Sequence, residues 1–138
     1  MASPIEVLKK ASPAKQAAPD FMCSVASRIF ATRNMLHFAH WDTGSFAKHI
    51  ALNELYDSIV DGLDEIMEVY QGKYGKVTGF YSEAASMPEC ICSRVKEEAK
   101  WIEDNRTFIS KGCTALESLI DDLLVSYTKT IYKLENLR

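Results

Sequence analysis

Histidines and acidic residues in one stretch of this 138-residue chain could bind a metal ion. His37, His40 and His49 lie close together in the sequence, and Asp64 and Glu68 follow them. Imidazole nitrogens and carboxylate oxygens are suitable ligands for iron and other first-row metals. The chemistry that these residue types indicate is therefore metal binding, and the elements that carry them decide whether they can meet.

A single long helix over about residues 45–71 must position most of these side chains. The stretch has no proline and one glycine, Gly62, and its apolar residues recur three and four apart. On a helical wheel one arc holds the apolar residues Leu52, Leu55, Ile59, Leu63 and Ile66. The neighbouring arc holds His49, Asn53, Asp57, Asp64 and Glu68. A stripe of potential metal ligands is therefore predicted along the edge of the buried face.

The length of this helix prevents the two ends of the stripe from holding one ion. At about 1.5 Å rise per residue, His49 and Glu68 are roughly 28 Å apart. Two antiparallel copies of the helix, related by a two-fold axis near residues 58–59, would bring His49 of one copy to Glu68 of the other. We expect a symmetric pair with two such sites. Gly62, near the crossing, would let the two backbones approach closely.

The same stretch resembles the Dps-like mini-ferritins. Their His-Trp pair at the end of the first helix matches His40 and Trp41. Their next helix begins with a His, followed four residues later by an Asp; here the residues are His49 and Asn53. Their D-E-x-x-E motif matches residues 64–68. In the family, the first three ligands come from one subunit and the last two from its two-fold mate. Asn53 departs from the family's carboxylate, and the connection between the two histidines is shorter than usual.

The resemblance implies an all-α, ferritin-like four-helix bundle with a long crossover between the second and third helices. It also implies a hollow shell of twelve subunits that oxidises ferrous iron, typically with hydrogen peroxide, and stores the ferric product. DNA protection under oxidative stress would accompany this activity. The catalytic residues would be His40, His49, Asp64 and Glu68. Asn53 would complete the metal site as a weak ligand or by holding a bridging water.

The expected domain covers residues 20–138. Asp20 is a suitable N-cap for a first helix that runs to about Trp41. Its predicted inner face consists of Phe21, Val25, Ile29, Leu36 and Ala39. The second helix is expected to end near Gln71–Gly72. The glycine-rich segment that follows suits a crossover along the bundle, anchored by the aromatic residues Tyr74, Phe80 and Tyr81.

Two further helices complete the predicted bundle. The sequence Ser86-Met-Pro-Glu89 reads as a capping box for a helix that runs to Lys111 and ends at Gly112. Thr114-Ala-Leu-Glu117 reads as a second capping box. The last helix presents an apolar seam of Leu116, Ile120, Leu123, Tyr127, Ile131 and Leu134.

Residues 1–19 read as a flexible tail with lysines at Lys9, Lys10 and Lys15. A Lys-bearing tail could bind DNA non-specifically, and three lysines predict weak binding at best. A plain solvated tail is the alternative. The net charge of −3 gives the whole chain no general attraction to nucleic acid.

Composition excludes several other classes. Hydrophobic residues make up 47% of the chain, which favours a folded core. No apolar run is long enough to span a membrane, and the N-terminus lacks an apolar signal core, so we expect a cytoplasmic protein. The four cysteines form no C-x-x-C pair and are expected to be reduced, buried or half-buried thiols.

Alternatives remain open at this point. The chain has no E-x-x-H motif, which argues against a di-iron site inside one subunit. An acidic stripe can be a solvated face, and His37 can be structural. Trp41 could intercept radicals or be an ordinary core residue. The rival function is a non-enzymatic structural or DNA-associated shell protein that has lost the iron chemistry, which Asn53 favours.

Overall fold

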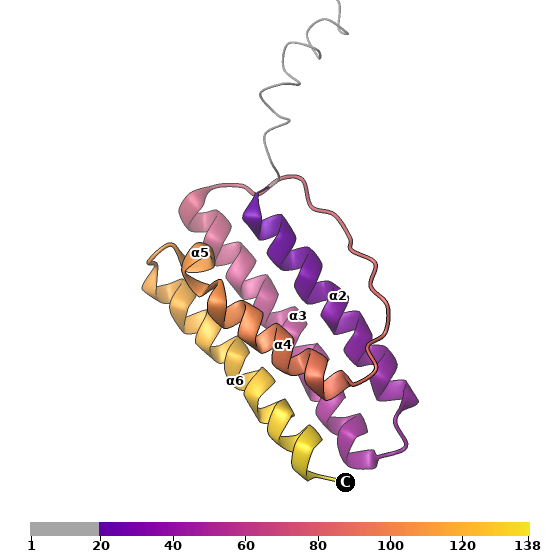
Figure 1. Ribbon diagram of the computed structural model, residues 1–138. Coiled ribbons are helices and arrows are strands. Elements are labelled where there is room, and N and C mark those ends of the chain that lie inside the picture. The colour runs from indigo at the N-terminus through magenta and orange to yellow at the C-terminus, as the bar shows by residue number, and fades with distance from the viewer. Residues whose placement is uncertain (1–19) are drawn as a thin grey trace, which may run out of the picture.

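The computed structural model describes residues 20–138 and is all-α (Figure 1). Its helices are α2 (Phe21–Asp42), α3 (Phe46–Tyr74), α4 (Ile91–Asp104), α5 (Arg106–Ser110) and α6 (Thr114–Asn136). The predicted lysine-bearing tail, residues 1–19, lies outside the described residues. None of the helices within residues 20–138 combines the length and apolar character needed to cross a bilayer.

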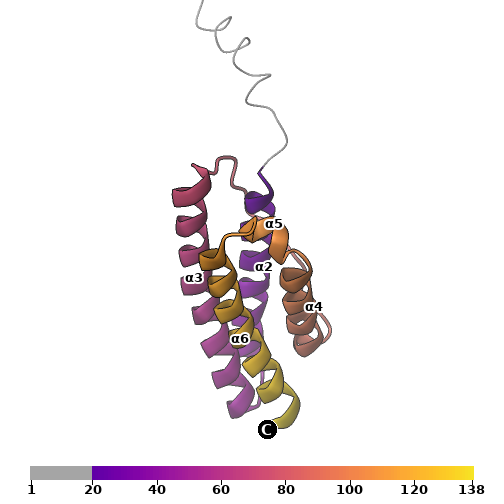
Figure 2. The same ribbon diagram turned by 90° about the vertical axis from the view of Figure 1, so that its left-hand side faces the viewer.

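The four long helices pack side by side. A short turn reverses the chain between α2 and α3, and a long segment then runs beside α2 to the opposite end, where α4 starts (Figure 1). α3 packs against α2 and α6, and α4 packs against the same two helices. Consequently α3 and α4 lie on opposite sides of the arrangement (Figure 2). The predicted long crossover between the second and third long helices is confirmed.

The core contains the apolar arc predicted for α3. Its five residues, Leu52, Leu55, Ile59, Leu63 and Ile66, are all buried. Gly62 has a different role from the predicted one. A Cβ atom at Gly62 would lie 3.1 Å from Cδ1 of Leu123, so the glycine faces α6 of the same subunit. It allows α6 to pack closely and does not lie on the outer face where a second copy would cross.

The ends of the first two helices lie within a few residues of the predicted positions. The Asp20 carboxylate accepts a hydrogen bond from the backbone N–H of Met22, as an N-cap should. Phe21 is exposed rather than on the predicted inner face. α3 continues past Gly72 to Tyr74 and stops at Gly75, whose φ of 101° is accessible mainly to glycine.

Both predicted capping boxes are wrong. α4 begins only at Ile91. Pro88 disfavours the helical conformation at Met87, and a box capped by Ser86 would need Met87 in the helix. In α6, Thr114 is already the first helical residue and Cys113 precedes it without a side-chain cap.

The predicted third helix is broken near Asn105 into α4 and α5. Arg106 sits at the break and forms ion pairs with Glu103, Glu117 and Asp121. Glu117 also accepts a hydrogen bond of 2.5 Å from the Ser110 hydroxyl. This network fixes the start of α6 in place of the expected capping box.

Aromatic residues attach the crossover and its entry to the helices. The Tyr74 hydroxyl, at the end of α3, donates to the carbonyl of Ser110 at 2.8 Å. Tyr81 donates to the Ser24 hydroxyl on α2 at 3.3 Å. Phe80 remains half exposed, so its anchoring within the subunit is incomplete. All four cysteines are free, as expected, although Cys90 is exposed rather than buried.

Candidate metal site at the α2–α3 turn

Two predicted ligands meet where α2 turns into α3. His40 lies in the last turn of α2 and His49 in the first turns of α3. The Ser45 hydroxyl caps α3 by accepting from the N–H of Lys48, and the Ser45 N–H is bonded to the Thr43 hydroxyl. This capped turn brings the two imidazole rings into a stack, with centroids 3.6 Å apart and planes inclined by 17°.

The two histidines are held by a reciprocal pair of hydrogen bonds. Nδ1 of His40 lies 2.6 Å from the carbonyl oxygen of His49, and Nδ1 of His49 lies 2.7 Å from the carbonyl oxygen of His40. A carbonyl only accepts, so each Nδ1 must carry the proton. In the neutral imidazole the lone pair is then on Nε2. The backbone thus selects the tautomer in which Nε2 can bind a metal ion, a common arrangement around metal-ligating histidines.

Aromatic side chains surround the histidine pair. His37 stacks on Tyr56 with ring centroids 4.2 Å apart. The rings of Tyr56 and His40 are nearly perpendicular, with centroids 5.4 Å apart. The Arg33 guanidinium lies 5.1 Å above the Tyr56 ring. Partial burial, and next the charge of Arg33, lower the pKa of His37. His37 is therefore part of the packing around the site.

Asn53 is engaged in two hydrogen bonds of its own. Its carbonyl oxygen accepts from the Tyr56 hydroxyl at 2.7 Å. Its amide nitrogen donates to the Asp57 carboxylate at 3.0 Å. A carbonyl oxygen has a second lone pair, so Asn53 can still serve as the weak ligand expected from the sequence. Its orientation, however, is determined by Tyr56 and Asp57.

Asp64 and Glu68 lie farther along α3 and are both exposed. Along the axis of α3, Asp64 lies about 22 Å from His49. Within residues 20–138 no three His, Cys, Asp or Glu side chains are grouped closely enough to hold a metal ion. One subunit therefore brings together His40 and His49, and the carboxylates could join them only from another copy.

Trp41 is not the core residue that one sequence interpretation predicts. It is 66% exposed and contacts His37 with ring centroids 4.5 Å apart. The indole thus lies at the surface, beside the aromatic residues that surround the histidine pair.

Sequence reasoning missed a second polar cluster, in the interior. Glu98 on α4 is fully buried and its Oε2 lies 3.1 Å from Nε of Arg28 and 3.4 Å from Nη2 of Arg94. Glu98 Oε1 and the Tyr127 hydroxyl are buried without a hydrogen-bond partner in the described part of the chain. Burial raises the pKa of both groups, while the two arginines oppose the effect on Glu98.

The sequence does contain a signal for this cluster. The buried residues of α4 are Val95, Glu98 and Ile102, spaced three and four apart, so a glutamate occupies an apolar position of the helix. Tyr56 was missed too, although it lies seven residues after His49 and so on the same helix face.

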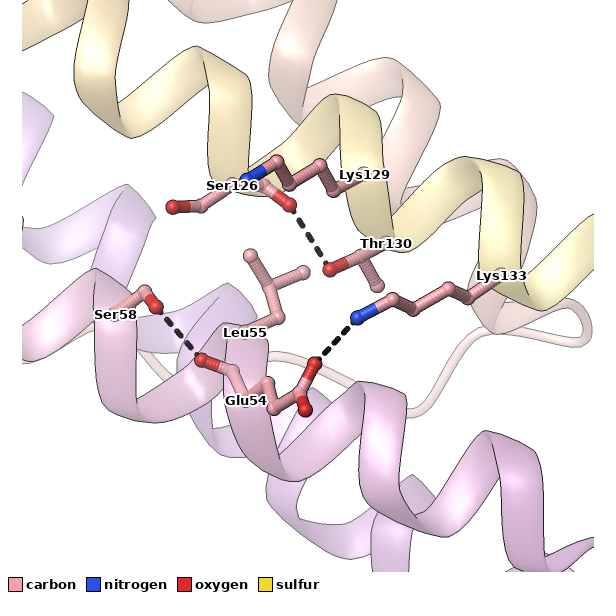
Figure 3. A pocket seen from close by; sticks show the side chains of 7 residues that line it. All are labelled: Glu54, Leu55, Ser58, Ser126, Lys129, Thr130 and Lys133. Carbon is pink, nitrogen blue, oxygen red and sulfur yellow. Dashed lines mark hydrogen bonds and ion pairs between the residues drawn. The ribbon is translucent and has the colours of Figure 1, made fainter.

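A surface pocket between α3 and α6 offers less for binding (Figure 3). Its Ser58 and Thr130 hydroxyls donate to carbonyls of their own helices, at 2.8 and 2.9 Å. The Glu54 carboxylate is paired with the Lys133 ammonium at 2.6 Å. These hydroxyls and this ion pair are thus already engaged, whereas the histidine pair keeps both Nε2 atoms available.

Comparison with known proteins places the chain in a family. The model of the family of unknown function DUF5856 matches residues 40–134, which include all the predicted ligands. A relative in Enterobacteria phage T4, the "Uncharacterized 14.6 kDa protein in mobD-ri intergenic region", is 25% identical over 107 residues, covering 77% of this chain and 81% of the phage protein. No solved structure matches the chain. Since the family model spans well over half of the residues, the chain belongs to the family of unknown function DUF5856.

Proposed function

We propose that this protein is a divergent Dps-like mini-ferritin with a ferritin-like bundle, which oxidises ferrous iron at sites shared between two subunits and stores the ferric product in a shell. The observation that carries the proposal is the pair of stacked histidines whose Nδ1 atoms are bonded to backbone carbonyls. Fixing both tautomers in this way suits two metal ligands. A purely structural pair would not need both Nε2 atoms available.

The second support is the distribution of carboxylates on α3. Asp64 and Glu68 are exposed, and no ion pair involves them within residues 20–138. A two-fold axis near residues 58–59 would bring these oxygens to the histidine pair of another copy. Oxygen and imidazole ligands together suit iron.

In the proposed reaction iron is the substrate. Two ferrous ions each lose one electron to hydrogen peroxide, which takes up two protons and leaves as two water molecules. His40, His49, Asp64 and Glu68 would hold the ferrous ions, with Asn53 as a weaker oxygen ligand. The ferric product would be stored in the shell. Ferrous binding should weaken as the pH falls, because protons compete for the imidazole nitrogens.

The experiment compares peroxide-dependent iron oxidation by wild type, His49→Ala, Asn53→Asp and His37→Ala at one pH. His49→Ala should lose most of the activity. Asn53→Asp should gain, because a carboxylate is a stronger ligand for a hard cation than an amide. His37→Ala is the matched control, a histidine in the same aromatic cluster that is not a predicted ligand. Wild-type rates in His49→Ala with no gain in Asn53→Asp would overturn the proposal.

The second candidate is a shell protein without iron chemistry, with or without DNA association. The specific observation in its favour is Asn53, whose amide is already bonded to Tyr56 and Asp57. This candidate predicts assembly without peroxide-dependent iron oxidation. Any DNA binding by the lysines of residues 1–19 should fade steeply with salt and disappear when those residues are deleted.

A further inference from the structure

A groove lies on the α2–α3 face, towards the end that is distant from the histidine pair. α2, α3 and the crossover line it, with a cavity volume of about 270 Å³. Its walls include Phe30, Met67, Phe80 and Tyr81, and Asp64 lies at its rim. The three aromatic side chains, Phe30, Phe80 and Tyr81, are about half exposed. Contiguous exposed apolar surface of this kind commonly marks an interaction site.

The other end of the same helix pair carries protruding apolar side chains. Phe38 and Trp41 end α2, and Phe46 and Ile50 begin α3. All four are exposed, from 41% for Ile50 to 78% for Phe46. We call these four residues the turn patch. The subunit therefore has apolar side chains that protrude at one end of the α2–α3 pair and an apolar groove towards the other.

The end with the turn patch carries Arg33 together with the exposed carboxylates of Asp42 and Asp57, and the groove end is acidic. Arg33 lies over Tyr56 on the side of the turn patch, and no carboxylate within residues 20–138 forms an ion pair with it. Asp61, Asp64 and Glu68 are exposed on the groove side. An antiparallel copy would place its acidic end opposite the end that carries Arg33 and the histidines. Attraction between Arg33 and the acidic end of the other copy would favour this register.

We propose that the groove binds the turn patch of a second copy of this chain, and that the same contact recurs in reverse across a two-fold axis. Positions 50 and 67 are equally distant from the point midway between residues 58 and 59. An axis there sets Ile50 of each copy against Met67 of the other, and Trp41 towards the partner's Tyr81. The inference rests on the two-fold arrangement of the proposed function and adds its apolar anchors. Buried Trp side chains are frequent anchors of such interfaces.

Cysteine cross-linking tests this register. Ile50→Cys and Met67→Cys are prepared separately in a Cys90→Ser, Cys92→Ser background. Within one helix these positions are about 26 Å apart, far beyond the span of a disulfide. A mixture of the two variants should form disulfide-linked dimers under mild oxidation, while each variant alone should not. Self-linking of Ile50→Cys, or no link in the mixture, would overturn the proposed contact.

A charge substitution provides an independent measurement. Ile50→Glu would bury a carboxylate against the apolar groove, so it should weaken self-association at least tenfold in sedimentation experiments. Val125→Glu on α6 is the matched control, a similarly exposed apolar residue outside the proposed contact, and it should associate as wild type does. Equal association of Ile50→Glu and wild type would contradict the contact.

The two proposals fail in different ways. Cross-linking between positions 50 and 67 without any iron oxidation would support the proposed interface and contradict the proposed ferroxidase function. Iron oxidation without the cross-link would keep the function and show that the copies meet in another register.

Discussion

The two polar clusters of this protein differ in what they leave unsatisfied. At the α2–α3 turn, backbone carbonyls bind one nitrogen of each histidine and leave the other nitrogen available. In the interior, two arginines surround one oxygen of Glu98, and its other oxygen is buried with no hydrogen-bond partner among residues 20–138. The first arrangement can accept a ligand from outside the subunit. The second is closed, so its polar groups act on stability and packing.

The clusters also differ in the distance along the chain that they bridge. His40 and His49 are nine residues apart and are joined by one capped turn. Arg28 and Glu98 are separated by 70 residues and meet only after α2 and α4 have packed. The local cluster therefore forms with its helix pair, while the interior cluster depends on the packing of α4 against α2.

The largest expected effect comes from breaking the interior cluster. Glu98→Ala leaves Arg28 and Arg94 without their buried partner and should destabilise the protein by about 3–5 kcal/mol. The measurement is the free energy of unfolding in urea. Glu97→Ala is the control, because Glu97 is exposed and its ion pair within residues 20–138 is with Arg94 at 3.7 Å; it should cost about 0–1 kcal/mol. Similar losses for both variants would show that Glu98 is no more important than a surface charge.

The difference in sequence separation between the two clusters explains which features could be predicted from the sequence. The long α3, its buried arc and the junction of His40 with His49 depend on helical periodicity and a nearby turn. Glu98 was missed although Arg94 precedes it by four residues on α4, because its other partner, Arg28, lies on another helix and is not marked by any local pattern. Gly62 was assigned to the wrong contact because the wheel shows which residues share a face and not which helix covers that face.

Pro88 and Asn105 explain the two errors in helix boundaries. A capping motif can be recognised at Ser86 from residue types alone, but Pro88 disfavours the backbone conformation that it needs at Met87. The break at Asn105 depends on Arg106, whose partners Glu117 and Asp121 lie on α6. Tertiary ion pairs of this kind leave no periodic signal in the sequence.

A smaller effect is expected at the open cluster. Tyr56→Phe removes the hydroxyl that binds the Asn53 carbonyl and keeps the ring that stacks on His37. Loss of one hydrogen bond should cost about 0.5–1.5 kcal/mol of unfolding free energy. It also frees the Asn53 oxygen, so ferrous binding should tighten if Asn53 is a ligand. Tyr132→Phe on exposed α6 surface is the control for both measurements. Unchanged iron affinity in Tyr56→Phe would remove Asn53 from the ligand set.

The smallest effect concerns the pH dependence of stability, to which two carboxyl groups contribute with opposite signs. Hydrogen bonds from Ser110 and then Arg106 hold the pKa of Glu117 below its usual value, whereas burial raises the pKa of Glu98. The stabilisation from Glu117 is therefore present above the unfolded pKa of about 4.3 and lost as the pH falls through the lower folded value. The contribution of Glu98 has the opposite sign, since stability falls as the pH rises through its raised pKa. Because Glu117 is partly exposed, its pair should contribute only about 0.2–1 kcal/mol. Unfolding in urea between pH 3 and pH 7 should show less loss on acidification in Glu117→Gln than in wild type. If the two proteins lose stability in parallel, the Glu117 carboxylate does not stabilise the junction of α5 and α6.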